Sequence, residues 1–166
     1  MMGSIELFKQ TDAGKILLTF LLSMLPLTEL RGSIPVGIAM GLNPWAAMLA
    51  GIAGTMVPVP FIIVFIRRIF AWLRVKSEGF ERLIGALEKR TLTKGSAVNK
   101  YKGLGLFIFS MLPVPGAGAW SSALLAALLD VRLKKALPSI FAGVVFEGLL
   151  FAGLMIGVKS IFSALT

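Results

Sequence analysis

The 166-residue chain contains no cysteine and no histidine, and only 15% of its residues are charged. Disulfides, thiol chemistry, soft-metal sites and histidine proton relays are therefore excluded, and any proton coupling must use a carboxylate. Soluble domains are about 45–50% apolar, whereas 57% of this chain is hydrophobic. The composition predicts an integral membrane protein that forms a single membrane domain over residues 1–166.

The acidic residues are few, eight in all, and they are scattered along the chain. Nucleophilic catalysis needs a nucleophile beside a base, and acid–base catalysis needs a positioned proton donor or acceptor. Without histidine, cysteine or a clustered acid pair, neither arrangement is indicated. The sequence therefore predicts no enzyme, no metal site and no cofactor.

Basic charge is concentrated in one segment, residues 67–102, in a chain with a net charge of +9. Such a segment usually marks a cytoplasmic loop. Apolar residues recur at helical spacing on both sides of Gly79, so we expect amphipathic helices lying on anionic lipid head groups, and no nucleic-acid binding. The basic residues are Arg67, Arg68, Arg74, Lys76, Arg82, Lys89, Arg90, Lys94, Lys100 and Lys102.

The tetrapeptide Ser-Met-Leu-Pro occurs at residues 23–26 and again at residues 110–113. Each copy ends an apolar run and is followed by a segment unsuited to a continuous membrane helix. We therefore predict two repeats, residues 16–66 and 103–158, each with a broken segment and a whole spanning helix, at about 45–66 and 136–158. Internal repeats with matching interruptions are typical of secondary transporters, whose binding sites lie at the breaks.

Two topologies fit this pattern. In one, each broken segment is a re-entrant hairpin, each repeat crosses the membrane once, and the repeats are inverted. In the other, each broken segment crosses the membrane and the repeats are parallel. The distribution of Lys and Arg does not separate the two, but the arms before the breaks are only half a bilayer core long. Arms of this length favour the inverted hairpin arrangement.

Three charged residues lie inside the apolar segments: Glu29, Arg31 and Glu147. A charge at the centre of a membrane helix is costly, so these residues are candidates for substrate or ion binding. Glu29 and Arg31 could instead neutralise each other. Gly32 and Pro35 predict a non-helical turn here, from which both charges could face one cavity. Away from water a carboxyl favours its protonated form, which makes Glu147 a candidate proton carrier.

The second break is rich in proline and glycine, which indicates irregular backbone. Such backbone at membrane depth occurs where it is buried in protein or lines a cavity, although a simple kink is the alternative. Helices restarting near Ile34 and Ala119 would present N-termini, which attract anions. An aromatic residue follows the break and could stack on a substrate or simply pack. The candidate residues here are Pro113, Pro115, Gly116, Gly118 and Trp120.

The segments 29–35 and 112–120 resemble the bacterial and archaeal small multidrug export protein family, distantly similar to the DedA superfamily of SNARE-associated, VTT-domain proteins. The resemblance implies inverted re-entrant hairpins with tips meeting at mid-membrane, and lipid transport in a prokaryotic inner membrane. It matches Glu29 and Arg31 to the acid and base of the first hairpin. It matches Pro113, Pro115 and Gly116 to the tip of the second. A second arginine pair is expected after that tip, and its nearest counterpart is Arg132.

Three functions remain open from the sequence. The first is an ion-coupled transporter or flippase for an anionic amphiphile such as a polyprenyl or phospholipid phosphate. The second is a proton-coupled exporter of lipophilic cations, and the third is a non-transporting membrane biogenesis scaffold. The small residues Gly51, Ala53 and Gly54 allow close helix approach and leave room for a homodimer.

Overall fold

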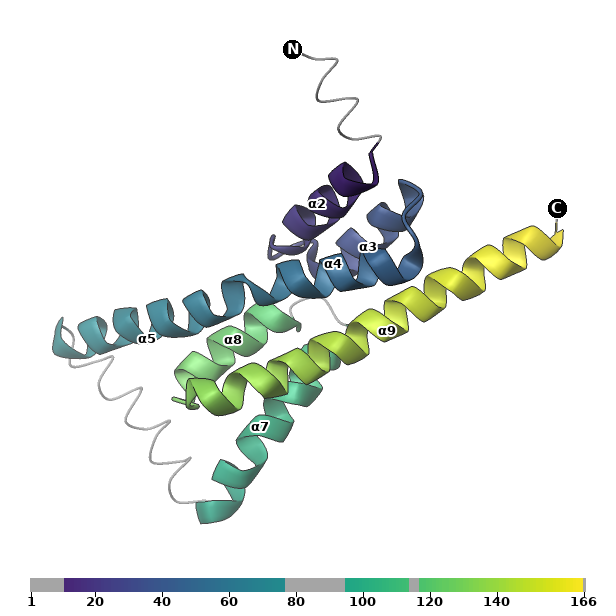
Figure 1. The fold of residues 1–166 in the computed structure, drawn as a ribbon. Coiled ribbons are helices and arrows are strands. Elements are labelled where there is room, and N and C mark those ends of the chain that lie inside the picture. Colours follow the sequence, from purple (N-terminus) through teal and green to yellow (C-terminus); the bar gives the residue numbers. More distant parts are fainter. Residues whose placement is uncertain (1–10, 77–94, 114–116, 166) are drawn as a thin grey trace, which may run out of the picture. The chain divides into compact units, whose positions relative to one another are not determined.

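The computed structural model describes residues 11–76, 95–113 and 117–165, and these are mostly helical (Figure 1). The chain divides into two packed units. The first consists of Met1–Pro58 together with Val144–Thr166, and the second is Val59–Gly143. We call these unit 1 and unit 2, and describe each by itself. The helices are α2 (Asp12–Ser23), α3 (Glu29–Ala39), α4 (Pro44–Met56), α5 (Pro58–Lys76), α7 (Gly95–Met111), α8 (Ala119–Leu128) and α9 (Leu133–Leu165).

Two helical stretches of the described residues are long and apolar enough to cross a membrane. One covers the 29 residues Pro44–Trp72, through α4 and into α5, and the other covers the 26 residues Leu133–Val158 of α9. At 1.5 Å per residue each exceeds the bilayer core of about 30 Å. The all-helical class and the two spanning segments expected from the sequence are therefore confirmed by length and composition.

In unit 1, α2 and α3 form an antiparallel helical hairpin. A Cβ placed on Gly41, just after α3, would lie 3.7 Å from Nζ of Lys15 at the start of α2. A Cβ on Gly37 would lie 2.7 Å from Oγ1 of Thr19, one turn further along each helix. The chain turns at residues 24–28, so both open ends of the hairpin lie together.

Helix α4 packs along this hairpin through residues with small side chains. A Cβ on Gly51 would lie 2.9 Å from the Leu30 side chain, and one on Gly37 would lie 3.1 Å from Cβ of Ala47. Further along α4, the hydroxyl of Thr55 donates to the carbonyl of Ser23 at 3.2 Å. Small residues let helix backbones approach closely, which is how membrane helices gain packing energy. The turn of the hairpin therefore lies beside the end of α4.

In unit 2, α7 and α8 pack against each other, and α7 also lies against the first part of α9. The ammonium of Lys102 in α7 donates to the carbonyl of Leu129 at the end of α8, at 3.0 Å. A Cβ on Gly103 would lie 2.9 Å from the Ser139 hydroxyl oxygen in α9. Unit 2 thus places the middle of α7 beside the end of α8.

The helix boundaries follow from local chemistry. Asn43 caps α4, because its Oδ1 accepts a hydrogen bond from the Trp45 N–H at 2.9 Å, and Pro44 occupies the first helical position. An asparagine cap followed by proline is a favoured helix start. Gly41, in the connection between α3 and α4, has a φ of 90°, a conformation that costs glycine little.

Large apolar side chains cover much of the outer surface. Leu27, in the hairpin turn, is 96% exposed, and Phe61 of α5 is 70% exposed. In water such surfaces would be a liability, whereas in a bilayer they face lipid. The exposed side chains are consistent with the membrane location that the composition predicts.

Half of the predicted basic linker, residues 77–94, falls outside the described residues. Its first part, residues 67–76, continues α5, and its last part lies in α7. The two interfacial helices expected between residues 69 and 87 cannot be compared as a whole, because residues 77–94 are not among those described.

Candidate functional site

An ion pair joins two residues that lie far apart in the sequence. Nε of Arg31 lies 2.8 Å from Oε1 of Glu147, across 116 residues of chain. Both residues belong to unit 1, Arg31 on α3 and Glu147 on α9. The Glu147 side chain is 1% exposed and the Arg31 side chain 21% exposed. Two of the three charges in the apolar segments are therefore brought together.

Glu147 stands near the middle of the spanning part of α9. The residue after it, Gly148, packs on α4, where a Cβ would lie 3.2 Å from the side chains of Met48 and Ile52. The Glu147 side chain itself is 1% exposed, so it is largely removed from solvent. A charge in such a position needs a partner of opposite charge, and removal of the partner typically costs about 3–5 kcal/mol. Arg31 supplies that partner.

The hairpin turn positions Arg31 at the start of α3. Glu29 is 6% exposed and has a φ of 37°, one of two positive φ values at non-glycine residues in the described chain. The Gly32 N–H donates to the Thr28 carbonyl at 2.7 Å, and the Thr28 hydroxyl donates to the Leu22 carbonyl. Positive φ at a residue other than glycine costs energy and persists where its surroundings hold it. The turn is thus a tightly determined element.

The prediction of a non-helical turn around Gly32 and Pro35 is wrong. Both residues lie within α3, which begins at Glu29 rather than near Ile34, and the break falls at residues 24–28. The physical reason is the apolar stripe of α3, since Leu30, Ile34 and Ile38 recur at helical spacing and are buried. Their burial outweighs the low helix propensities of glycine and proline, about 1 and 3 kcal/mol.

Residues 29 and 31 consequently stand on one helix, where residues two apart do not face each other. The sequence left open a pairing of Glu29 with Arg31, and the structure pairs Arg31 with Glu147. The sequence reasoning missed this partner. The only signal in the sequence was the number of charges in the apolar segments. One basic residue and two acidic residues lie there, so either acid could be the partner of Arg31.

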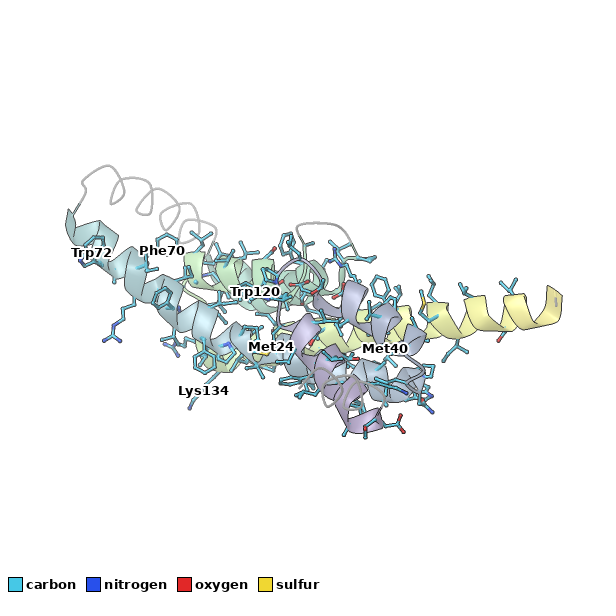
Figure 2. The ribbon with its side chains drawn as sticks, turned by 90° about the horizontal axis from the view of Figure 1, so that it is seen from above. Met24, Met40, Phe70, Trp72, Trp120 and Lys134 are labelled. Carbon is cyan, nitrogen blue, oxygen red and sulfur yellow. The ribbon has the colours of Figure 1, made fainter. Side chains whose placement is uncertain are left out.

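The second break lies in unit 2, and a helix begins directly after it at Ala119, as expected. Gly118 precedes α8 with a φ of 144°, which confirms that a glycine is needed there. Trp120, the second residue of α8 and labelled in Figure 2, is partly buried, whereas Pro113 is exposed. Pro115 and Gly116 lie outside the described residues.

The predicted site residues are therefore divided between the units. A single site around both breaks stays a prediction, because each unit is described by itself. No group of three or more Asp and Glu residues that could hold a metal occurs in residues 11–76, 95–113 and 117–165. Glu29, Arg31, Gly32, Pro35 and Glu147 lie in unit 1, and Pro113, Gly118 and Trp120 lie in unit 2.

Comparison with known proteins gives one match. A family model described as "Putative small multi-drug export protein" matches residues 29–150, most of the chain. The chain belongs to this family. The small multidrug export match begins at Glu29 and includes both Arg31 and Glu147, so the ion pair lies within the shared region. No curated protein and no solved structure matches the chain significantly.

Proposed function

We propose that this chain is a multi-pass exporter of a prokaryotic inner membrane that moves lipophilic cations outward in exchange for protons. The observation that carries the proposal is the ion pair between Arg31 and Glu147, with its 2.8 Å separation and its buried carboxylate. Membership of the export family supports the direction and the class of substrate.

The buried carboxylate provides a physical basis for exchange. One positive species at a time neutralises the Glu147 carboxylate. This species is Arg31, a proton or a cationic substrate. Because an unpaired buried charge costs several kcal/mol, Arg31 leaves the carboxylate only as another positive species arrives. Proton and substrate therefore compete for one oxygen pair, and competition of this kind couples their movements in opposite directions.

The hairpin of unit 1 supports the re-entrant topology. Its arms, α2 and α3, have 12 and 11 residues, or about 18 and 16 Å, roughly half of a bilayer core of about 30 Å. Their open ends lie together at Lys15 and Gly41. A broken segment of this form enters and leaves on the same side of the membrane, so unit 1 crosses only through its long helices.

Matching contacts in the two units support a repeat. The N–H groups of Gly41 and Leu42 donate to the carbonyls of Ile38 and Gly37. In unit 2 the same pattern recurs 89 residues later. There the N–H groups of Asp130 and Val131 donate to the carbonyls of Ala127 and Ala126.

The 89-residue spacing differs from the 87-residue spacing of the two Ser-Met-Leu-Pro copies. Asp130, with its positive φ of 49°, thus corresponds to Gly41, with its φ of 90°. The two additional residues of the second repeat lie in its break, between Ser110 and Gly118. We infer that two inverted copies of one hairpin unit build the exporter.

Transport into proteoliposomes under an imposed pH gradient tests the proposal. We expect the wild-type protein to move a lipophilic cation such as ethidium in the direction opposite to the flow of protons. We expect Glu147→Gln to abolish this movement. Asp12→Asn, which removes an exposed acid of α2, is the matched control and should retain transport. Unaltered proton-driven transport by Glu147→Gln would exclude the assigned role.

A second candidate is transport of an anionic amphiphile such as a lipid phosphate. Its supporting observation is that Arg31 is the more exposed member of the pair, 21% against 1%. An arriving anionic head group would therefore meet the guanidinium first. In this case a lipid phosphate should raise the thermal unfolding midpoint of the wild-type protein but not of Arg31→Ala. Equal stabilisation of both proteins would reject this candidate.

A further inference from the structure

Unit 2 contains an apolar cavity between α7 and α8. It has a volume of about 320 Å³ and lies between Tyr101, Gly105 and Phe109 on one helix and Leu125 and Leu129 on the other. Ligand pockets in proteins begin at about 300 Å³. Along α7 the cavity runs from residue 101 to residue 109, about 12 Å at 1.5 Å per residue. A slot of this length suits part of a lipid acyl chain.

A second cavity of unit 2 is polar and has a volume of about 330 Å³. Three basic side chains line it, those of Lys102, Arg132 and Lys135, together with Asp130. Lys102 also lines the apolar cavity, so the two cavities share one residue. An apolar slot and a basic pocket that share a lining residue have the polarity of a phospholipid, with its chain in one and its phosphate in the other.

The acidic residue of the polar cavity has a partner of its own. Oδ1 of Asp130 lies 3.4 Å from Nε of Arg67, and Arg67 also donates to the Val131 carbonyl. Arg67 does not line the cavity, so it offsets the negative charge of Asp130 without taking up a position in the lining. The three basic residues thus leave a positive balance in the cavity, which favours an anion.

The position of Lys102 is also defined. Its ammonium donates to the carbonyl of Leu129 at the C-terminal end of α8, at 3.0 Å. A lysine placed at a helix C-terminus is stabilised by the helix dipole. An ammonium has three N–H donors, so this single bond leaves capacity to bind a phosphate oxygen.

We propose that unit 2 binds one anionic membrane phospholipid. Its phosphate lies against Lys102, Arg132 and Lys135, and the first part of one acyl chain lies between α7 and α8. Tyr101, 58% exposed, marks the interface, where tyrosine is enriched. Basic pockets beside membrane helices recognise lipid head groups in this way.

This lipid site is independent of the proposed exchange at Glu147. It uses residues of unit 2 and none of the pair in unit 1. It also differs from a general attraction of lipids to the basic linker, since it assigns three particular cations and an adjoining apolar slot. A free phosphate would fill only the polar cavity, and a neutral hydrocarbon would fill only the apolar one.

Thermal unfolding and native mass spectrometry of the detergent-purified full chain test the proposal. Phosphatidylglycerol, phosphatidylcholine with the same acyl chains, and inorganic phosphate are each added. We expect phosphatidylglycerol alone to raise the unfolding midpoint and to give a one-lipid adduct. Equal effects of phosphatidylcholine would show non-specific lipid contact, equal effects of phosphate would show a phosphate site, and either result would overturn the proposal.

Variants test the basic cavity. Each Lys or Arg near a membrane surface contributes about 1 kcal/mol, so Lys102→Gln, Arg132→Gln and Lys135→Gln together should weaken phosphatidylglycerol binding roughly a hundredfold. Lys134→Gln is the matched control, because Lys134 belongs to the same turn, does not line the cavity and points away from the ribbon (Figure 2). Equal binding by the triple variant and by Lys134→Gln would refute the site.

A second pair of variants tests the apolar slot and keeps the proposal falsifiable if the triple variant does not fold. A Cβ on Gly105 meets nothing within 4 Å, so Gly105→Leu should fill the slot without a clash and reduce phosphatidylglycerol binding. Gly153 on α9 has equally open surroundings and lines neither cavity, so Gly153→Leu should bind normally. Undiminished binding by Gly105→Leu would exclude the acyl-chain position.

Discussion

The side chain of Ser23 fills the space that a Cβ on Gly54 would need. Oγ of Ser23 donates to the carbonyl of Phe20 at 2.7 Å, and both oxygens face Gly54 of α4. The last turn of α2 is therefore pressed directly on the backbone of α4. This contact limits how closely the hairpin can approach α4, the helix against which it packs.

Replacement of Gly54 by alanine should destabilise the protein. The added methyl group meets Ser23 Oγ and the backbone carbonyl of Phe20, which cannot move aside as a flexible side chain would. Overpacking of this kind costs about 1–3 kcal/mol. We expect a clear fall in the thermal unfolding midpoint in detergent. Gly153→Ala, with nothing within 4 Å, is the control and should be unchanged or slightly more stable.

The same substitution at Gly143 should have the same effect, because the contact recurs in unit 2. A Cβ on Gly143 would lie 2.7 Å from the carbonyl oxygen of Phe107 and would also meet Oγ of Ser110. Gly105→Ala is the control from the same unit. Similar losses for Gly54→Ala and Gly143→Ala would support the repeat. A Gly143→Ala protein as stable as Gly105→Ala would contradict it.

Much of the fold could be predicted from the sequence. Long uncharged runs predict spanning helices from composition alone, and the structure has them at Pro44–Trp72 and Leu133–Val158. The break before α8 was also predictable, because Gly118 adopts a backbone conformation that favours glycine. These features depend on local chemistry and hydropathy, which a sequence displays directly.

The candidate site was harder to predict. Gly32 and Pro35 indicate a turn locally, but the burial of Leu30 and Ile34 against neighbouring helices keeps this segment helical. The partner of Arg31 lies 116 residues away, and no local pattern identifies it. Contacts between distant segments depend on packing, so the charged residues were found and their pairing was not.

A double-mutant cycle should show that Arg31 and Glu147 depend on each other. Arg31→Met leaves a buried carboxylate without its cation, which should cost about 3 kcal/mol in unfolding free energy. Combining Arg31→Met with Glu147→Leu should recover part of this loss, because no charge remains buried. Chemical or thermal unfolding of the four proteins provides the measurement. Losses that add without interaction would show that the pair contributes nothing.

The topology can be tested with single cysteines, since the natural chain has none. In the inverted hairpin arrangement, Asp12→Cys and Asn43→Cys should react with a membrane-impermeant maleimide from the same side, and Lys134→Cys from the opposite side. If the broken segments crossed the membrane, Asn43→Cys and Lys134→Cys would react from one side and Asp12→Cys from the other. Labelling of intact cells and of inverted vesicles distinguishes these outcomes.

The two partners of the ion pair are carried by helices of very different length. Arg31 stands on α3, which has 11 residues, and Glu147 stands on α9, which has 33. Displacement of the short returning arm would separate the two charges without moving the long helix. A small moving part acting against a fixed carboxylate would let a chain of 166 residues cycle without reorganising its whole transmembrane framework.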